Sequence, residues 1–112
     1  LLLKFGKWLE MNGDAIYGTR PWIRAESKTL DNYEIRYTQK QDLLYAILLG
    51  KPKNSTITIK SLNLEYNTKI QILDNKKDLN WKNVGKNLEI QTPENLQWAP
   101  AYVFKIKPKP IK

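Results

Sequence analysis

Asp42-Leu43-Leu44-Tyr45-Ala46-Ile47-Leu48-Leu49 places seven consecutive apolar or aromatic residues after a single aspartate. An unbroken apolar run of this length, ended by Gly50 and Pro52, is typical of a β-strand that is covered on both faces. The run therefore predicts the central strand of a layered β-structure.

The segments around this run alternate between apolar and polar residues, which is the pattern of strands with one buried face. The alternation appears before the run at Tyr33, Ile35 and Tyr37, and after it at 56–60, 69–73, 79–81, 88–90 and 102–106. A polar turn at 83–87 predicts a hairpin, and Pro108 and Pro110 prevent the last strand from continuing as a central one. The sequence thus predicts an all-β fold, a two-sheet antiparallel β-sandwich of about seven or eight strands.

The first twelve residues follow a different period. Leu2, Phe5 and Leu9 recur at three- to four-residue spacing, and Asn12-Gly13 is a helix-ending pair, so we expect one short N-terminal helix. The sequence begins without Met inside this amphipathic segment, and we therefore interpret it as a piece of a longer protein. The apolar face of the helix should fold back on the sandwich or pair with another copy of the chain.

Composition excludes several classes of protein. The 112 residues contain no Cys and no His, which removes disulfides, Cys/His zinc sites and the commonest general base, and we expect no metal and no cofactor. The net charge of +8 is scattered along the chain among Asp and Glu, with one lysine-rich tail after residue 104 and no nucleic-acid recognition motif. We therefore expect a solvated basic surface, no nucleic-acid partner and no membrane span.

One segment carries a resemblance to a known family: Gly6-Lys7-Trp8-Leu9-Glu10-Met11-Asn12-Gly13-Asp14-Ala15-Ile16-Tyr17-Gly18-Thr19-Arg20-Pro21-Trp22. It resembles the junction segment of the α-L-fucosidases of glycoside hydrolase family 29, which usually reads G-x-W-L-x-x-N-G-E-A-I-Y-x-T-R-P-W. Asp14 departs from the more common Glu and keeps its charge. Ile35-Arg36-Tyr37-Thr38 and Leu44-Tyr45-Ala46-Ile47 resemble the first sandwich strands of the family, so the specific resemblance covers about half of the chain.

The resemblance implies that residues 1–22 are the end of a catalytic (β/α)8 barrel and its junction, and that residues 23–112 are a non-catalytic C-terminal sandwich packed on that barrel. It implies a retaining hydrolysis of α-L-fucosides by an Asp nucleophile and a Glu or Asp acid/base, which lie in the barrel. No residue of this chain matches the nucleophile motif, so no catalytic residue is predicted here and the chain alone should be inactive. The implied location is the periplasm or the exterior of a bacterium.

The junction supplies the candidate site, for which we predict packing between the two domains. The residues predicted to make this contact are Phe5, Trp8, Leu9, Asn12, Gly13, Tyr17, Arg20 and Trp22. A sugar-stacking platform of Trp8, Tyr17 and Trp22 is the alternative, since an aromatic face suits the apolar side of a pyranose. Arg20 is expected in a structural ion pair, with a substrate contact as the alternative.

Two further classes of function compete with the supporting domain. A carbohydrate-binding module for fucosylated glycans would expose two or three aromatic residues on one face, and Trp81 and Trp98 are its candidates, although core or rim positions suit them equally. A basic nucleic-acid-binding barrel would interleave aromatic residues with Arg on neighbouring strands, a pattern that Tyr33, Arg36 and Tyr37 do not complete on one face.

Overall fold

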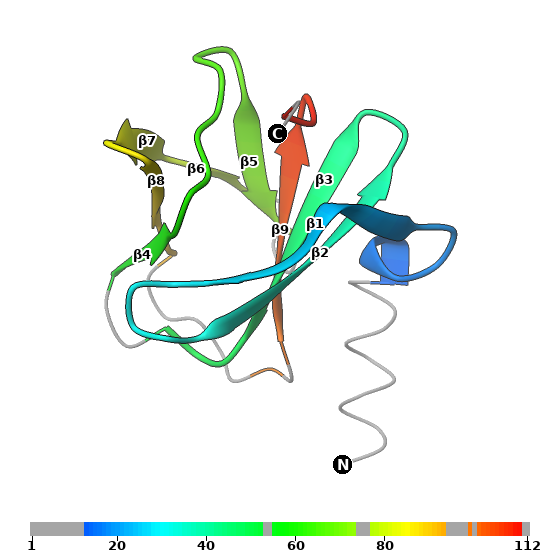
Figure 1. Cartoon of the computed structure of the whole chain (residues 1–112), viewed down its shortest axis with the longest axis horizontal. Coiled ribbons are helices and arrows are strands. Elements are labelled where there is room, and N and C mark those ends of the chain that lie inside the picture. The colour runs from blue at the N-terminus through cyan, green and yellow to red at the C-terminus, as the bar shows by residue number, and fades with distance from the viewer. Residues whose placement is uncertain (1–12, 53–54, 74–76, 94–98, 100, 111–112) are drawn as a thin grey trace.

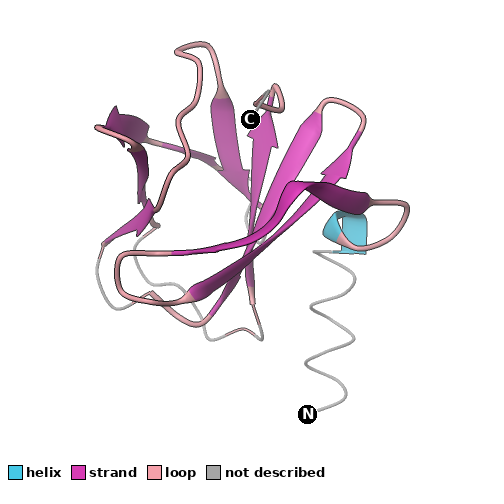
Figure 2. Ribbon diagram, viewed as in Figure 1, coloured by secondary structure: helices cyan, strands magenta, loops and turns pink. Residues whose placement is uncertain are grey.

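A computed structural model of the chain describes residues 13–52, 55–73, 77–93, 99 and 101–110. In this part the chain forms nine strands in two antiparallel sheets and one three-residue 3₁₀ helix, η1 (Gly13–Ala15), as Figures 1 and 2 show. The strands are β1 (Arg20–Lys28), β2 (Glu34–Lys40), β3 (Leu43–Leu49), β4 (Thr56–Ile59), β5 (Lys69–Ile72), β6 (Asp78–Leu79), β7 (Trp81–Val84), β8 (Asn87–Gln91) and β9 (Tyr102–Lys107). The predicted all-β, two-sheet antiparallel fold is confirmed.

The larger sheet has the order β1-β2-β3-β9-β5-β6, and the smaller has the order β4-β8-β7. Inward-facing side chains of both sheets form one buried cluster between them, in which Phe104, Ile72 and Ile90 are fully buried. A second cluster, with Tyr45, Ile47 and Val103, lies on the other face of the six-stranded sheet. The sandwich therefore has a core between its sheets and a smaller apolar layer on its outer face.

Strand β3 occupies the position that its sequence predicts. It pairs with β2 on one side and β9 on the other. Leu44, Ala46 and Leu48 contribute to the core between the sheets, while Tyr45 and Ile47 belong to the cluster on the outer face. A strand with one buried face alternates between apolar and polar residues, because every second side chain lies in water. The unbroken apolar run of β3 therefore fits a strand that is buried on both faces.

The predicted number of strands was too low, because the structure adds β1 and β6. The register of β1 shifts between Pro21 and Glu26, so its inward and outward positions do not keep a strict period of two. β6 has only two residues, too few to show any period. The predicted hairpin is confirmed as β7 and β8, in which Val84 pairs with Asn87 across Gly85 and Lys86.

The predicted N-terminal helix falls on residues 1–12, which lie outside the described residues, and it remains a prediction. β1 begins at Arg20, inside the segment that we assigned to the junction. The division into residues 1–22 and 23–112 likewise remains a prediction.

Both open sides of the sandwich are bridged. On one side, β1 meets β4 through the bridge between Thr29 and Ile59 and the bond from the Lys60 amide to the Lys28 carbonyl (3.1 Å). On the other side the chain itself crosses from β6 in the large sheet to β7 in the small one through Asn80. These bridges protect edge strands that would otherwise offer unpaired backbone groups to another chain.

Candidate functional site

The first described segment, η1, lies against the outer face of the six-stranded sheet. The carbonyl of Gly13 accepts hydrogen bonds from the amides of Ile16 and Tyr17, both at 2.8 Å, which closes a tight turn. A Cβ atom at Gly13 would lie 3.0 Å from two carbons of the Tyr17 ring. Glycine is therefore needed at this position for the ring to approach the backbone so closely.

Ala15 joins this turn to the sheet. Its side chain is fully buried in the outer-face cluster, and its carbonyl accepts a 2.8 Å hydrogen bond from the Thr38 hydroxyl on β2. The Thr19 hydroxyl donates to the Ile16 carbonyl at 2.9 Å and reaches the Ala15 carbonyl at 3.3 Å. The chain thus comes into the sandwich across the outer face, with its direction fixed by hydrogen bonds.

Three large apolar side chains in the turn after η1 and in β1 remain exposed: Ile16 is 43% exposed, Tyr17 62% and Ile23 65%. We call these three residues the junction patch. Single exposed apolar residues are common on protein surfaces, but several on one short segment indicate a contact surface. Covering one such side chain contributes roughly 1.5–3 kcal/mol.

The structure separates the predicted site residues into three groups. Phe5, Trp8, Leu9 and Asn12 lie outside the described residues. Gly13 is buried in the turn, whereas Tyr17 and Arg20 are exposed on the junction. Trp22 is only 5% exposed and belongs to the core between the sheets. The interdomain contact of the set remains a prediction.

Trp22 packs inside the sandwich itself. Its ring meets that of Tyr37 edge to face, with 5.1 Å between the ring centroids, and the Arg24 guanidinium lies 5.1 Å from the Trp22 ring centroid. Arg24 also donates to the Ser61 carbonyl at 2.6 Å, across the bridged side of the sandwich. Trp22 therefore has no open ring face on which a sugar could stack.

Sequence reasoning missed Ile16 and Ile23 as site residues. Ile16 stands in the quoted junction motif, and Ile23 follows the buried Trp22 in β1, so its side chain points away from the core. The signal for Ile23 was the alternation in β1, and the register shift obscured it.

The hydroxyl of Tyr37 is an unusual group in the core. It is buried, and no hydrogen bond of good geometry reaches it within the described residues; the adjacent Ser27 hydroxyl donates to the Lys60 carbonyl at 3.3 Å. Burial raises the pKa of the Tyr37 hydroxyl, against smaller, opposite influences of the neighbouring Ser27 hydroxyl and the Arg24 charge. Such a group is a cost to stability, since it loses its hydrogen bonds to water on folding.

We therefore expect Tyr37→Phe to raise the free energy of unfolding by about 1 kcal/mol at neutral pH, because it removes an unpaired buried hydroxyl and keeps the ring. Above the ordinary tyrosine pKa of 10.0 the unfolded chain ionises at this residue before the folded chain does, so the wild type loses stability as pH rises. The variant should lack this part of the loss. Urea denaturation at neutral and alkaline pH measures both effects, and a variant clearly less stable than the wild type would show that the hydroxyl has a partner.

The carboxyl groups of the described side chains lie at the surface of the sandwich. None of their carboxyl groups is buried, and Glu26 and Glu34 both contact the Arg36 guanidinium, at 3.5 and 3.4 Å. A carboxyl that acts as a general acid at neutral pH usually needs an environment that holds its proton, such as an apolar pocket. The same part of the chain contains no cluster of three metal-ligating side chains and no helix suited to crossing a membrane.

The two antiparallel sheets packed on one core define a domain of the all-β class. The sequence places this domain in a family. The model of the family described as "Alpha-L-fucosidase C-terminal domain" matches residues 28–107. The chain belongs to this family.

Its relatives are longer proteins. An α-L-fucosidase of Branchiostoma floridae is 38% identical over 95% of this chain, and the human tissue α-L-fucosidase is 38% identical over 83%. The crystal structure of Thermotoga maritima α-fucosidase superposes on 94% of this chain with a TM-score of 0.84 and 41% identity. The matched regions make up 24%, 20% and 25% of those three proteins, so the chain spans a quarter of their length or less.

Proposed function

We propose that this chain is the non-catalytic C-terminal sandwich of an α-L-fucosidase, which packs on and supports a barrel domain of the same polypeptide. That barrel hydrolyses terminal α-L-fucosides with retention. The observation that carries the proposal is the junction patch: Ile16, Tyr17 and Ile23 are exposed on the segment through which a preceding domain would connect. The relatives, of which this chain spans a quarter or less, supply the length for such a domain.

A supporting role suits the way in which η1 is held. The bond between Thr38 and the Ala15 carbonyl fixes the direction of the chain at the sheet, so a preceding helix would leave the sandwich in a defined orientation. Covering the junction patch would then add apolar burial on both domains. Support of this kind needs no chemistry from the sandwich.

We assign the catalytic carboxyl groups to the remainder of the parent enzyme. A retaining glycosidase holds two carboxyl groups about 5–5.5 Å apart, one as nucleophile and one as acid/base. The described carboxyl groups of the sandwich are exposed or half-buried on its surface. Fucoside hydrolysis by the parent enzyme is part of the proposal.

The test compares one substitution in two contexts, the isolated chain and the full-length enzyme. Ile23→Lys should leave the isolated chain within about 0.5 kcal/mol of the wild type, because surface substitutions usually do so. In the full-length enzyme the same change should cost roughly 1.5–3 kcal/mol, because the side chain would be covered by the barrel there. Denaturant unfolding of both proteins measures the difference.

Leu30→Lys provides the matched control, since Leu30 is an aliphatic residue of similar exposure (54%). It lies beside β4, where its amide donates to the Thr58 carbonyl. We expect this variant to behave alike in the two contexts. Equal effects of Ile23→Lys in the isolated chain and in the full-length enzyme would refute docking through the junction patch.

Three expectations from the sequence stay predictions. The relatives include animal as well as bacterial proteins, so neither the bacterial origin nor the periplasmic or secreted location is decided. Self-association through Phe5 and Leu9 concerns residues outside the described part. A carbohydrate-binding module remains the alternative function, and one surface of the sandwich, at Trp81, favours it.

A further inference from the structure

The side of the sandwich where the chain crosses from β6 to β7 carries a half-buried tryptophan. Leu79 ends β6 in the large sheet, Asn80 links the sheets, and Trp81 begins β7 in the small sheet. The Trp81 ring packs against the margin of the core, and its indole N–H donates to the Thr68 carbonyl at 3.0 Å. This bond fixes the ring and uses its only polar group, so its remaining open surface is apolar.

A groove of about 430 Å³ opens beside this ring, lined by Tyr66, Leu79, Asn80, Trp81 and Asn83. Its volume lies within the range of small-molecule sites, roughly 300–1,000 Å³. Tyr66 is 94% exposed, so its ring contributes almost nothing to the core of this domain. Tyr66 and Trp81 thus place two aromatic side chains along the lining of one groove.

The loop that carries Tyr66 is held in place at both ends. Before it, the Asn83 amide group accepts from the Leu64 amide at 3.0 Å and donates to the Leu64 carbonyl at 2.8 Å. After it, Thr68 accepts the bond from Trp81, and its amide donates to the Glu65 carbonyl at 3.0 Å. The backbone on either side of Tyr66 is therefore fixed relative to Trp81.

None of the five groove residues carries a charge at neutral pH. A second hollow of about 250 Å³ on the other side of Trp81 is lined by Asn80, Trp81, Lys82, Glu89 and Gln91. There the Lys82 ammonium and the Glu89 carboxylate lie 3.8 Å apart and offset each other. The side-chain amide of Asn80 donates a long hydrogen bond of 3.4 Å to the amide oxygen of Gln91. Both amide groups have further donors and acceptors for a ligand.

This chemistry selects among ligand classes. Phosphate or sulfate groups need unpaired Lys or Arg, and a metal needs several carboxylates, neither of which lines the groove. Aromatic faces beside amide groups match a neutral sugar, whose C–H faces are apolar and whose hydroxyls both donate and accept. We propose that the groove formed by Trp81, Tyr66 and Asn80 binds a neutral glycan chain.

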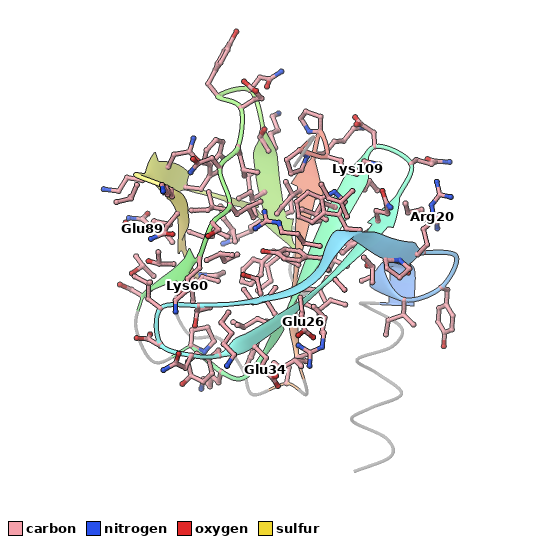
Figure 3. The ribbon with its side chains drawn as sticks, in the orientation of Figure 1. Arg20, Glu26, Glu34, Lys60, Glu89 and Lys109 are labelled. Carbon is pink, nitrogen blue, oxygen red and sulfur yellow. The ribbon has the colours of Figure 1, made fainter. Side chains whose placement is uncertain are left out.

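The groove also lies away from the junction. Figure 3 shows Glu89, which lines the second hollow, at the opposite side of the molecule from Arg20, where β1 begins. Because the groove lies away from the junction, only a long glycan could occupy it while the terminal fucose of that glycan is in the barrel; this assignment rests on the proposed function, whereas glycan binding itself does not.

The experiment uses the full-length enzyme and two substrates, an aryl α-L-fucoside that fills only the active site and a fucosylated oligosaccharide that is long enough to reach the groove. Tyr66→Ala and Trp81→Ala should raise KM for the oligosaccharide about three- to tenfold, the loss of one ring contact, without changing kcat. Kinetics on the aryl fucoside should not change. Tyr66→Phe keeps the ring and should behave as the wild type, as should Val84→Ala, a change on β7 outside both hollows.

Tyr66→Ala keeps the proposal falsifiable even if Trp81→Ala fails to fold, because Tyr66 is almost fully exposed. Titration calorimetry with the oligosaccharide gives a readout independent of turnover and should show binding weakened by Tyr66→Ala. Unchanged KM and affinity in Tyr66→Ala would overturn the proposal, as would tighter binding of a sulfated form of the oligosaccharide. An enzyme that binds the oligosaccharide through Tyr66 but hydrolyses no fucoside would instead contradict the proposed function alone.

Discussion

Phe104→Ala is expected to lower the free energy of unfolding by about 3–5 kcal/mol, the cost of removing a large side chain from a closely packed core. Phe104 is fully buried on β9 and pairs with Ala46 on one side and Ile72 on the other. Its side chain belongs to the cluster between the sheets, so neither sheet alone could cover the cavity left by the substitution. Since small domains are stable by only about 5–15 kcal/mol, the variant would lose much of its stability.

Urea denaturation of the isolated chain measures this loss, with an expected fall in the midpoint of roughly 2 M. Val84→Ala serves as the control, because Val84 is 44% exposed on the edge strand β7 and its truncation should cost no more than about 0.5 kcal/mol. A Phe104→Ala variant within 1 kcal/mol of the wild type would show that the two sheets do not close over β9. The stability of the fold would then have to come from elsewhere.

The sequence predicts the centre of this fold better than its sides. The run at 43–49 identifies β3 because burial on both faces produces an unbroken apolar run in the local sequence, and the alternation at 34–40 and 102–107 identifies its neighbours. The local pattern of β1 is weaker. Thr29, the residue after β1, bridges to Ile59 on β4, a contact between positions 30 apart in the chain that no local period can show.

The motif locates the junction in the sequence, but it does not show which of its residues are buried and which are exposed. Trp22 and Tyr17 stand close together in the same motif, yet Trp22 is in the sandwich core and Tyr17 is exposed. The pairing of β1 with β2 sets the face that Trp22 occupies, whereas Tyr17 lies in the turn closed by the Gly13 carbonyl. The exposure of Ile23 follows from the same pairing.

The groove could not be predicted from local sequence at all. Its aromatic residues are 15 positions apart, and they line one groove because Asn83 and Trp81 both bond to the loop that carries Tyr66. Trp81 was a candidate from its residue type, but Tyr66 was not. Its exposure becomes visible only when the strands on either side of the loop are placed.

In the proposed function, the sandwich supports a fucosidase without taking part in its chemistry. The isolated, folded chain should therefore show no hydrolysis of an aryl α-L-fucoside above the blank, because the two carboxyl groups of a retaining mechanism are assigned to the barrel. The full-length enzyme should hydrolyse the same substrate at least about a million-fold faster than the uncatalysed reaction. Circular dichroism of the isolated chain provides the control that its β-structure is intact.

The deciding measurement is the release of the aryl group by the pure isolated chain, compared with the full-length enzyme at equal concentration. The account predicts turnover by the full-length enzyme and none by the chain. Turnover by the isolated chain that disappears on Glu89→Gln or Glu26→Gln would contradict it, because the sandwich would then supply a catalytic carboxyl group of its own.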